Sequence, residues 1–426
     1  MINSNIISKL IKDKSKLIEY LRKNITQLKD IIYIAEHHRN SEHTLRCESS
    51  DEGVELRIND NLTLNFWGSN SLIKKLTYAS ILKYIGTEGV RKIVILLIRK
   101  EGKVYRCTDL PRLKDAKIQI PIVVVNFFSI AFLSVIIFLP ICSINIFPAL
   151  LTIITLPIII PLTYLSVIAR KFFKFDISDA MIEKVVINLR DDVNTIIINR
   201  LVKLLRSAKL KVLFRIVNNL SRSRKYVESI QTEQINIKNL LSKLSSKNLS
   251  KTRVYLVDSD KCNASSIKLP TRDIILLTTK LVAQLGSDEL LAVLAHECSH
   301  LKNNDSLKLL ALISLDQFLK ILILVLCIFY LHVSVPTIVI ILILYSISYY
   351  ALLAKVLRRY EYVADKYALK ITNFVSITKA LLKIGWRIAT KELLLRSWLD
   401  TFQKIFSTHP DILSRVYSLY CECREY

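Results

Sequence analysis

The chain has 426 residues, which is enough for two or three domains. Its mean hydropathy of +0.35 is high for a soluble protein and counts against that class. The formal net charge is +25, so the placement of the cations decides whether the charge indicates nucleic-acid binding or a membrane topology.

The sequence predicts a small cytoplasmic α+β domain of unknown role over residues 1–118. DKSKLIEYLRKNITQLKDIIYIAEHH keeps a helical apolar period, so we expect helix over 1–44. GVELRINDNLTLNFW, at 53–67, alternates like a β-hairpin, and a helix near 71–85 and a strand at 92–98 follow. The start is amphipathic and basic, without the apolar core of a signal peptide.

Three histidines lie close together in HHRNSEH, namely His37, His38 and His43. They have no cysteine partners and no metal-site spacing, so we interpret them as the solvated end of a helix. The helix and hairpin of this domain leave a winged DNA-binding module as an alternative, although no recognition-helix signature is present.

The first long apolar run, Ile118 to Ala169, contains no Lys, Arg, Asp or Glu. A single crossing takes about 20 apolar residues. We therefore expect a first transmembrane hairpin over 119–169, with spans near 119–141 and 147–169 joined by CSINIF. A buried helical hairpin in a soluble core is the alternative.

A second uncharged run, Ile321 to Ala354, is short for two full spans. Either its helices are shortened, or the first begins before residue 321 and carries Asp316 and Lys320 to the edge of the membrane. Those two residues are four apart and could pair, which would lower the cost of entry. The second transmembrane hairpin is expected at about 308–355, inside the domain that follows.

Cations gather at the ends of both apolar runs, and the turns CSINIF and LHVSVPT have none. The flanking cations are Arg112, Lys114, Lys117, Arg170, Lys171, Lys174, Lys355, Arg358 and Arg359. The positive-inside rule then places both turns outside, and both termini and every large polar segment in the cytoplasm. This predicts a multi-pass protein of the cell (plasma) membrane. The pI of 9.7 reflects topology rather than nucleic-acid binding, and the basic surface could bind anionic lipid.

After the first hairpin, residues 170–250 are charged and expected to form a helical cytoplasmic segment. From residue 251 the pattern becomes strands (RVYLVD, ASSIKL, DIILLT) and then helices, TKLVAQL and SDELLAVLAHECSHLKNN. The second helix begins after the break at Gly286 and Ser287. The eight cysteines show no CxxC spacing and are interpreted as free thiols.

The second helix carries HECSH, in which His296 and His300 are four residues apart. Residues at that spacing share a helix face, so both imidazoles can reach one zinc ion. Glu297 can then take the proton of an activated water. HExxH alone is a moderate signal, but the apolar flank LLAVLA would desolvate the histidines and so favours a ligand role. Cys298 should face away from the metal.

A catalytic zinc needs a third protein ligand. Asn303 and Ser306 stand where a metzincin needs Gly and His, so that class is excluded. RRYEYVADKYALK places Glu361 and Asp365 four apart, so one could bind metal while the other braces a histidine. This requires an even number of crossings between the two motifs, and the second hairpin provides it.

The motifs HECSH, HLKNND, EYVAD and STHPDILSR, over roughly 251–418, resemble the M48 family of membrane zinc metallopeptidases. The four-span HtpX-like type is a nearer match than the seven-span CAAX prenyl protease type. The 118 residues ahead of the first hairpin, and the large segment 172–250, depart from the HtpX-like pattern.

The resemblance implies a role for each matching residue. His296, His300 and Glu361 would bind one zinc ion, Glu297 would be the general base, and Asp365 would orient His296. His409 would stabilise the oxyanion and Arg415 would help to hold the cleft. Asn263 and Ala264 would belong to an edge strand that pairs with the substrate backbone.

The sequence therefore predicts an α+β integral membrane protein with two transmembrane hairpins, or four spans. Its zinc metallopeptidase domain, residues 251–426, would be mainly helical, of gluzincin type, with a small β-sheet. It would be a zinc endopeptidase acting on polypeptides, with the lipid bilayer as its other partner and no nucleic acid. The family suggests quality control of damaged proteins. The alternatives are a silent zinc-binding scaffold acting through its basic N-terminal domain, a membrane-tethered DNA-binding regulator and a four-span transporter.

Overall fold

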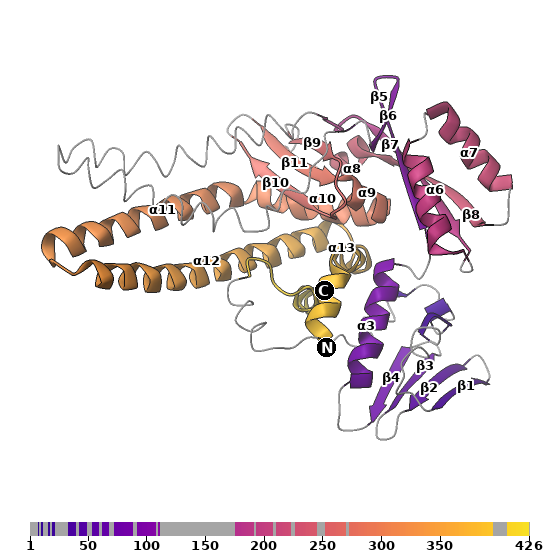
Figure 1. Cartoon of the computed structure of the whole chain (residues 1–426), viewed down its shortest axis with the longest axis horizontal. Coiled ribbons are helices and arrows are strands. Elements are labelled where there is room, and N and C mark those ends of the chain that lie inside the picture. The colour runs from indigo at the N-terminus through magenta and orange to yellow at the C-terminus, as the bar shows by residue number, and fades with distance from the viewer. Residues whose placement is uncertain are drawn as a thin grey trace.

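Over the residues that it describes, the computed structural model is mostly helical, with three small β-sheets (Figure 1). It describes residues 33–39, 42–48, 53–58, 62–67, 72–87, 92–107, 175–190, 193–207, 210–222, 226–244, 252–269, 272–394 and 407–425, with single positions between 7 and 21 and at 110. The predicted first hairpin, 119–169, lies outside the described residues.

The N-terminal sheet is an antiparallel meander in the order β1-β2-β3-β4. Its strands are β1 (Tyr33–Arg39), β2 (Glu42–Glu48), β3 (Gly53–Ile58) and β4 (Leu62–Trp67). The predicted hairpin over 53–67 is confirmed. The predicted helix over 1–44 is wrong beyond residue 32, because β1 and β2 pair with His38 opposite His43. The three neighbouring histidines thus lie on strands and not at a helix end, since the Asn-Ser turn signal between the strands outweighs a weak helical period.

A second antiparallel sheet has the order β6-β5-β7-β8. Its strands are β5 (Lys92–Lys100), β6 (Lys103–Arg106), β7 (Met181–Leu189) and β8 (Val227–Asn236). The helices in this part of the chain are α6 (Thr195–Ser207), α7 (Leu210–Arg222) and α8 (Ile237–Lys243). The prediction of a helical segment over 170–250 is therefore wrong for the residues of β7 and β8. Its polar strand β8 forms because β7 offers a long antiparallel partner, and this tertiary pairing overrides local propensity.

The third sheet has the order β10-β11-β9 and lies beside the second. Its strands are β9 (Thr252–Val257), β10 (Ala264–Lys268) and β11 (Asp273–Thr278). Ile177 N–H donates to the Val254 carbonyl at 2.7 Å, which joins the stretch before β7 to β9. The helices α9 (Thr279–Gln284) and α10 (Ser287–Lys302) follow. The strands and helices predicted here are confirmed.

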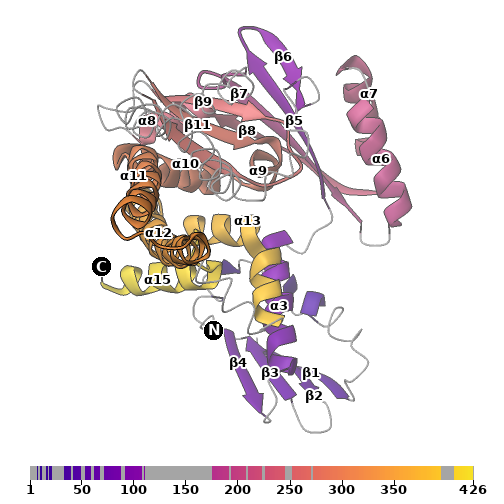
Figure 2. The same ribbon diagram turned by 60° about the vertical axis from the view of Figure 1, so that its left-hand side comes forward.

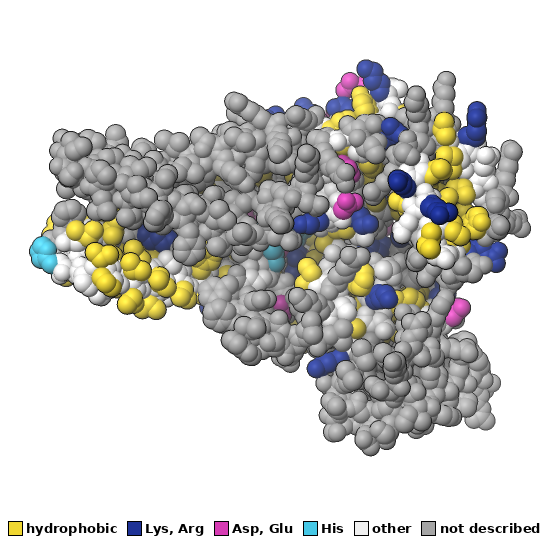
Figure 3. Space-filling view, in the orientation of Figure 1, with side chains coloured by type: hydrophobic (Ala, Val, Ile, Leu, Met, Phe, Trp, Pro, Cys, Tyr) yellow, Lys and Arg dark blue, Asp and Glu magenta, His cyan; other side chains and the backbone are white. Residues whose placement is uncertain are grey.

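Two long apolar helices project from the body as a hairpin (Figure 1). They are α11 (Asp305–Val325) and α12 (Val335–Ile371), and Leu326–Tyr330 is a π-helical turn. Both helices are long and apolar enough to cross a membrane. The first helix begins before residue 321, as one of the two predicted versions required. It buries Lys320 in a 2.7 Å ion pair with Asp316. Hydrophobic side chains cover much of the visible surface of the hairpin (Figure 3).

The C-terminal helices α13 (Phe374–Leu394) and α15 (Ile412–Glu425) pack under α10 and α12 (Figure 2). Helix α3 (Leu72–Thr87) of the N-terminal part packs along α13. At that contact a Cβ on Gly86 would lie 2.4 Å from the indole of Trp386, so only glycine allows this approach. One hydrophobic core therefore extends from the N-terminal part through α10, the helix with the HECSH motif, to α15.

Candidate metal centre

Buried charges hold the first turn of α10. The Gly286 N–H donates to Glu289 Oε2 at 3.0 Å. The Lys383 ammonium of α13 donates to the same oxygen at 2.8 Å, and both charged side chains are buried. The acidic residue thus satisfies an open helix N–H and interacts favourably with the positive end of the helix dipole.

The second sheet contacts the same helix end through Lys184 of β7 and Glu233 of β8. Lys184 Nζ donates to the Leu285 carbonyl at 2.8 Å and lies 3.4 Å from Glu233 Oε2. The other oxygen of Glu233 accepts the Ser287 N–H at 2.9 Å. The start of the helix that carries the histidines is therefore fixed by residues from three other elements.

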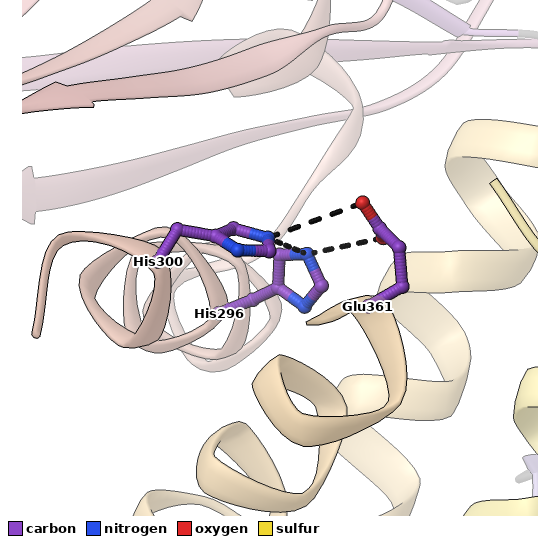
Figure 4. Close-up of side chains that lie close together, drawn as sticks. All are labelled: His296, His300 and Glu361. Carbon is purple, nitrogen blue, oxygen red and sulfur yellow. Dashed lines mark hydrogen bonds and ion pairs between the residues drawn. The ribbon is translucent and has the colours of Figure 1, made fainter. Parts of the chain in front are cut away.

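His296, His300 and Glu361 converge between α10 and α12 (Figure 4). The two Nε2 atoms are 3.3 Å apart. Glu361 Oε2 lies 3.5 Å from His296 Nε2, and Oε1 lies 4.0 Å from His300 Nε2. Ligands held tetrahedrally at about 2 Å from a zinc ion lie roughly 3.3 Å from each other. Two imidazoles and one carboxylate at these separations fit a zinc ion with one position left open.

Each histidine presents its other ring nitrogen to a carboxylate. His300 Nδ1 is hydrogen-bonded to Asp305 Oδ2 at 2.9 Å. His296 Nδ1 lies 3.0 Å from Asp365 Oδ1, at ion-pair distance but without hydrogen-bond alignment. Carboxylates in these positions leave both Nε2 atoms to face a metal.

Asp305 is a site residue to which the sequence motifs gave no role. It is the first residue of α11, and the preceding Asn304 has a left-handed backbone with φ of 57°. This turn brings the carboxylate back to His300, five residues earlier. An Asn-Asp pair directly after a metal-motif helix is the signal that could have identified it.

Arg415 links the carboxylates of α12 to α15. Its guanidinium donates to both oxygens of Asp365, at 2.7 Å and 2.6 Å. Its Nη1 lies 3.2 Å from Glu361 Oε2. A bidentate pair of this kind fixes both partners, and Arg415 is buried at the site rather than standing at its rim.

His409 reaches the site from the segment before α15. Its Nδ1 lies 2.9 Å from Glu361 Oε1, although 71% of its side chain is exposed. The hydrogen bond to Glu361 raises the pKa of His409. Arg358 Nη1 donates to the Ser407 carbonyl at 2.8 Å and so attaches this segment to α12.

Glu297 is buried next to His296 on α10. Cys298 is buried in the core, and burial raises the pKa of its thiol to about 12. It remains a neutral thiol near neutral pH, which is the form that binds zinc poorly. Asn263 and Ala264 lie where β10 begins, and β10 is an edge strand of its sheet and packs against α10.

Residues 221–421 match the family model of Peptidase family M48. The resemblance to family M48 is confirmed over this part of the chain. The His296, His300 and Glu361 group lies within the matched residues.

Among solved structures, the crystal structure of S. mikatae Ste24p is similar to this chain at 22% identity, with a TM-score of 0.32. The similarity covers 42% of this chain and 49% of that one. The chain thus matches about half the length of that relative.

Proposed function

We propose that this chain is a membrane-embedded zinc endopeptidase of gluzincin type. The observation that carries the proposal is the convergence of His296, His300 and Glu361 from two helices, with Asp305 and Asp365 behind the histidines. Packing alone does not account for that arrangement, because burying several charged groups is costly unless each has a partner.

A bound zinc ion would polarise the scissile carbonyl and lower the pKa of a water molecule. Glu297 would accept the proton of that water and later deliver it to the leaving amine. His409, whose Nδ1 lies 2.9 Å from Glu361 Oε1, would donate to the developing oxyanion. Arg415 would keep Glu361 and Asp365 charged and in place. The backbone of the substrate would add to the free edge of β10, beginning at Asn263 and Ala264.

Two pairings support a four-span topology. Strand β5 lies before the first apolar run and β7 after it, yet they are hydrogen-bonded in one sheet. The chain between them must cross a bilayer an even number of times. His296 and Glu361 stand in the same relation across the α11–α12 hairpin. With spans at 119–169 and in α11 and α12, all sheets and both termini would lie on the cytoplasmic side of the plasma membrane.

The proposed units are an N-terminal domain over 1–118, the first hairpin, a mixed α/β segment over 170–250, and the peptidase domain over 251–426. Unfolded or damaged polypeptides at the membrane are the proposed substrates.

The test is cleavage of an unfolded protein, such as reduced casein, by the full chain in detergent. Glu297→Gln should keep its zinc content and lose about 10²-fold to 10⁴-fold in kcat, because it removes the general base. Zinc is measured by atomic emission on the same samples. Glu289→Gln, which changes a neighbouring acid outside the site, separates loss of a helix cap from loss of the base.

If the wild type binds one zinc ion and does not cut, the endopeptidase proposal fails and the zinc-binding scaffold replaces it. If Glu297→Gln cuts as fast as the wild type, another residue is the base.

A further inference from the structure

The helix pair α6–α7 is an insertion that its sheet does not need. Strands β7 and β8 are direct neighbours, and Leu189 at the end of β7 pairs with Val227 at the start of β8. The Arg190 N–H donates to the Tyr226 carbonyl at 3.2 Å, so the two ends of the insertion are hydrogen-bonded to each other. The chain therefore leaves and returns at one point, where a tight turn would have sufficed.

One side of each helix packs on the sheet. Leu205 is buried in one hydrophobic cluster with Val185 and Ile187 of β7, and Leu201 and Val217 pack against this cluster. These contacts place the pair on one face of the second sheet and account for the inward half of its apolar residues.

The outward side of α6 is both apolar and cationic. Ile196 and Leu204 are 58% and 49% exposed, and Arg200 and Lys203 are exposed between them. Their spacing of four, seven and eight residues from Ile196 places all four on one helix face. On α7, Val212 is likewise exposed near the exposed Arg215. In Figure 3, yellow and dark blue side chains lie together over this part of the molecule.

After Asp191 and Asp192 at its start, the insertion contains no acidic residue from Val193 to Tyr226. Its cations in that range are Arg200, Lys203, Arg206, Lys209, Lys211, Arg215, Arg222, Arg224 and Lys225. The described outward cations Arg200, Lys203 and Arg215 have aliphatic side chains among them. This combination complements a partner that is anionic and apolar together.

The position and composition of the insertion argue against two kinds of anionic partner, membrane lipid and nucleic acid. Figures 1 and 2 both place α6 and α7 at the end of the molecule away from the α11–α12 hairpin. A bilayer around that hairpin cannot also touch α6, so the anionic lipid of the same membrane is out of reach. Aliphatic side chains do not stack on bases as aromatic ones do, which disfavours nucleic acid.

We propose that the outward face of α6–α7 is a docking surface for an acidic polypeptide segment that carries apolar side chains. Ile196 and Leu204 would anchor its apolar residues, and Arg200, Lys203 and Arg215 would pair with its carboxylates. The surface would recruit a protein that carries such a segment. Binding there involves no residue of the candidate metal centre, so this proposal does not depend on the proposed reaction.

The experiment measures binding of a fluorescent 20-residue amphipathic peptide of Glu and Leu to the full chain in detergent, by anisotropy, with zinc removed. Zinc-free protein keeps this result independent of peptidase activity. Matched peptides replace every Glu by Gln, or every Leu by Ser.

The double variant Arg200→Glu, Lys203→Glu should bind the acidic peptide at least about tenfold more weakly, because attraction becomes repulsion. The double variant Ile196→Ser, Leu204→Ser should bind the acidic peptide about threefold to tenfold more weakly, since two apolar anchors are removed. The control Lys238→Glu, Lys280→Glu reverses two exposed lysines on α8 and α9 and should bind within about twofold of the wild type. Both substituted peptides should bind more weakly than the parent.

Four outcomes would overturn the proposal. They are no binding of the acidic peptide by the wild type, an equal loss in the control variant, unchanged binding by both α6 variants, and preferential binding of single-stranded RNA or anionic vesicles that the α6 charge reversal abolishes.

Discussion

At the scale of single residues, the site is held by charges that are withdrawn from water. Asp365 is almost fully buried and accepts both hydrogen bonds of one guanidinium. Removing one partner from such a pair leaves the other uncompensated, which costs far more than the pair contributes. The positions of His296 and Glu361 therefore depend on Arg415, a residue on another helix.

Arg415→Met should lower the free energy of unfolding of the zinc-free protein by about 3–5 kcal/mol. In the double variant Asp365→Asn, Arg415→Met, the loss in free energy of unfolding should be smaller than the sum of the losses in the two single variants. Neither charge is then left without its partner. Denaturant titration followed by tryptophan fluorescence measures both. Additive losses would show that the two side chains do not act as a pair.

Asp305→Ala should weaken zinc binding about 10-fold to 100-fold, because His300 loses the carboxylate that orients its ring. Asp288→Ala is the matched control, since Asp288 also lies in the first turn of a helix but outside the site. Competition with a zinc-sensitive dye gives the two dissociation constants. Equal affinity in Asp305→Ala and the wild type would remove Asp305 from the site.

The sequence predicts which site residues lie together when helical spacing relates them. It predicts this less well when only the tertiary structure brings them together. His296 and His300 share a face in any regular helix, so the sequence alone brings them together. Asp305 reaches His300 only through the left-handed turn at Asn304. Arg415 and His409 come from a segment whose approach to α12 no local pattern describes, and only the family resemblance placed them.

At the scale of elements, the structure depends on close helix contacts that leave no room for side chains. Helix α3 approaches α13 at Gly86, where the Trp386 indole occupies the space of a Cβ. The helix α10 packs on α13 as well. The N-terminal part is therefore coupled by packing to the element that supports α10.

Gly86→Ala should destabilise the protein by about 1–3 kcal/mol, because a rigid ring must move to admit the methyl group. Thermal unfolding by circular dichroism measures the loss. In a Trp386→Leu background, adding Gly86→Ala should destabilise the protein less than it destabilises the wild type, because the indole is no longer in the way. If Gly86→Ala melts like the wild type, α3 and α13 are not packed as described.

Strands and helices were predictable where apolar residues alternate or repeat strongly, as in β5, β9, β11 and α10. The strands β1, β2, β6, β7 and β8 were missed because their residues are polar or ambiguous. Each of them forms by pairing with a neighbour, at His38 with His43 for β1 and along β5 for β7. Pairing of this kind is invisible to a single-segment pattern.

At the scale of the whole molecule, the two sides of the proposed membrane should be chemically distinguishable. In chains whose other cysteines are serine, the substitution His332→Cys in the hairpin tip should react with a membrane-impermeant maleimide on intact cells. Exposed Cys421 on α15 should react only after permeabilisation. Labelling of both positions on intact cells, or of neither position before permeabilisation, would contradict the hairpin topology.

The pairing of β5 with β7, and of the histidines with Glu361, also sets an order of events during biosynthesis. Strand β5 leaves the ribosome before its partner β7, with the residues of the first proposed hairpin synthesised between them. The histidines then wait for Glu361, which emerges only after the last span. A chain that has been synthesised only as far as the second hairpin lacks Glu361 and so has an incomplete ligand set. Under the proposed function, hydrolysis would therefore begin only after synthesis has passed residue 361, and the nascent chain would not cleave other copies.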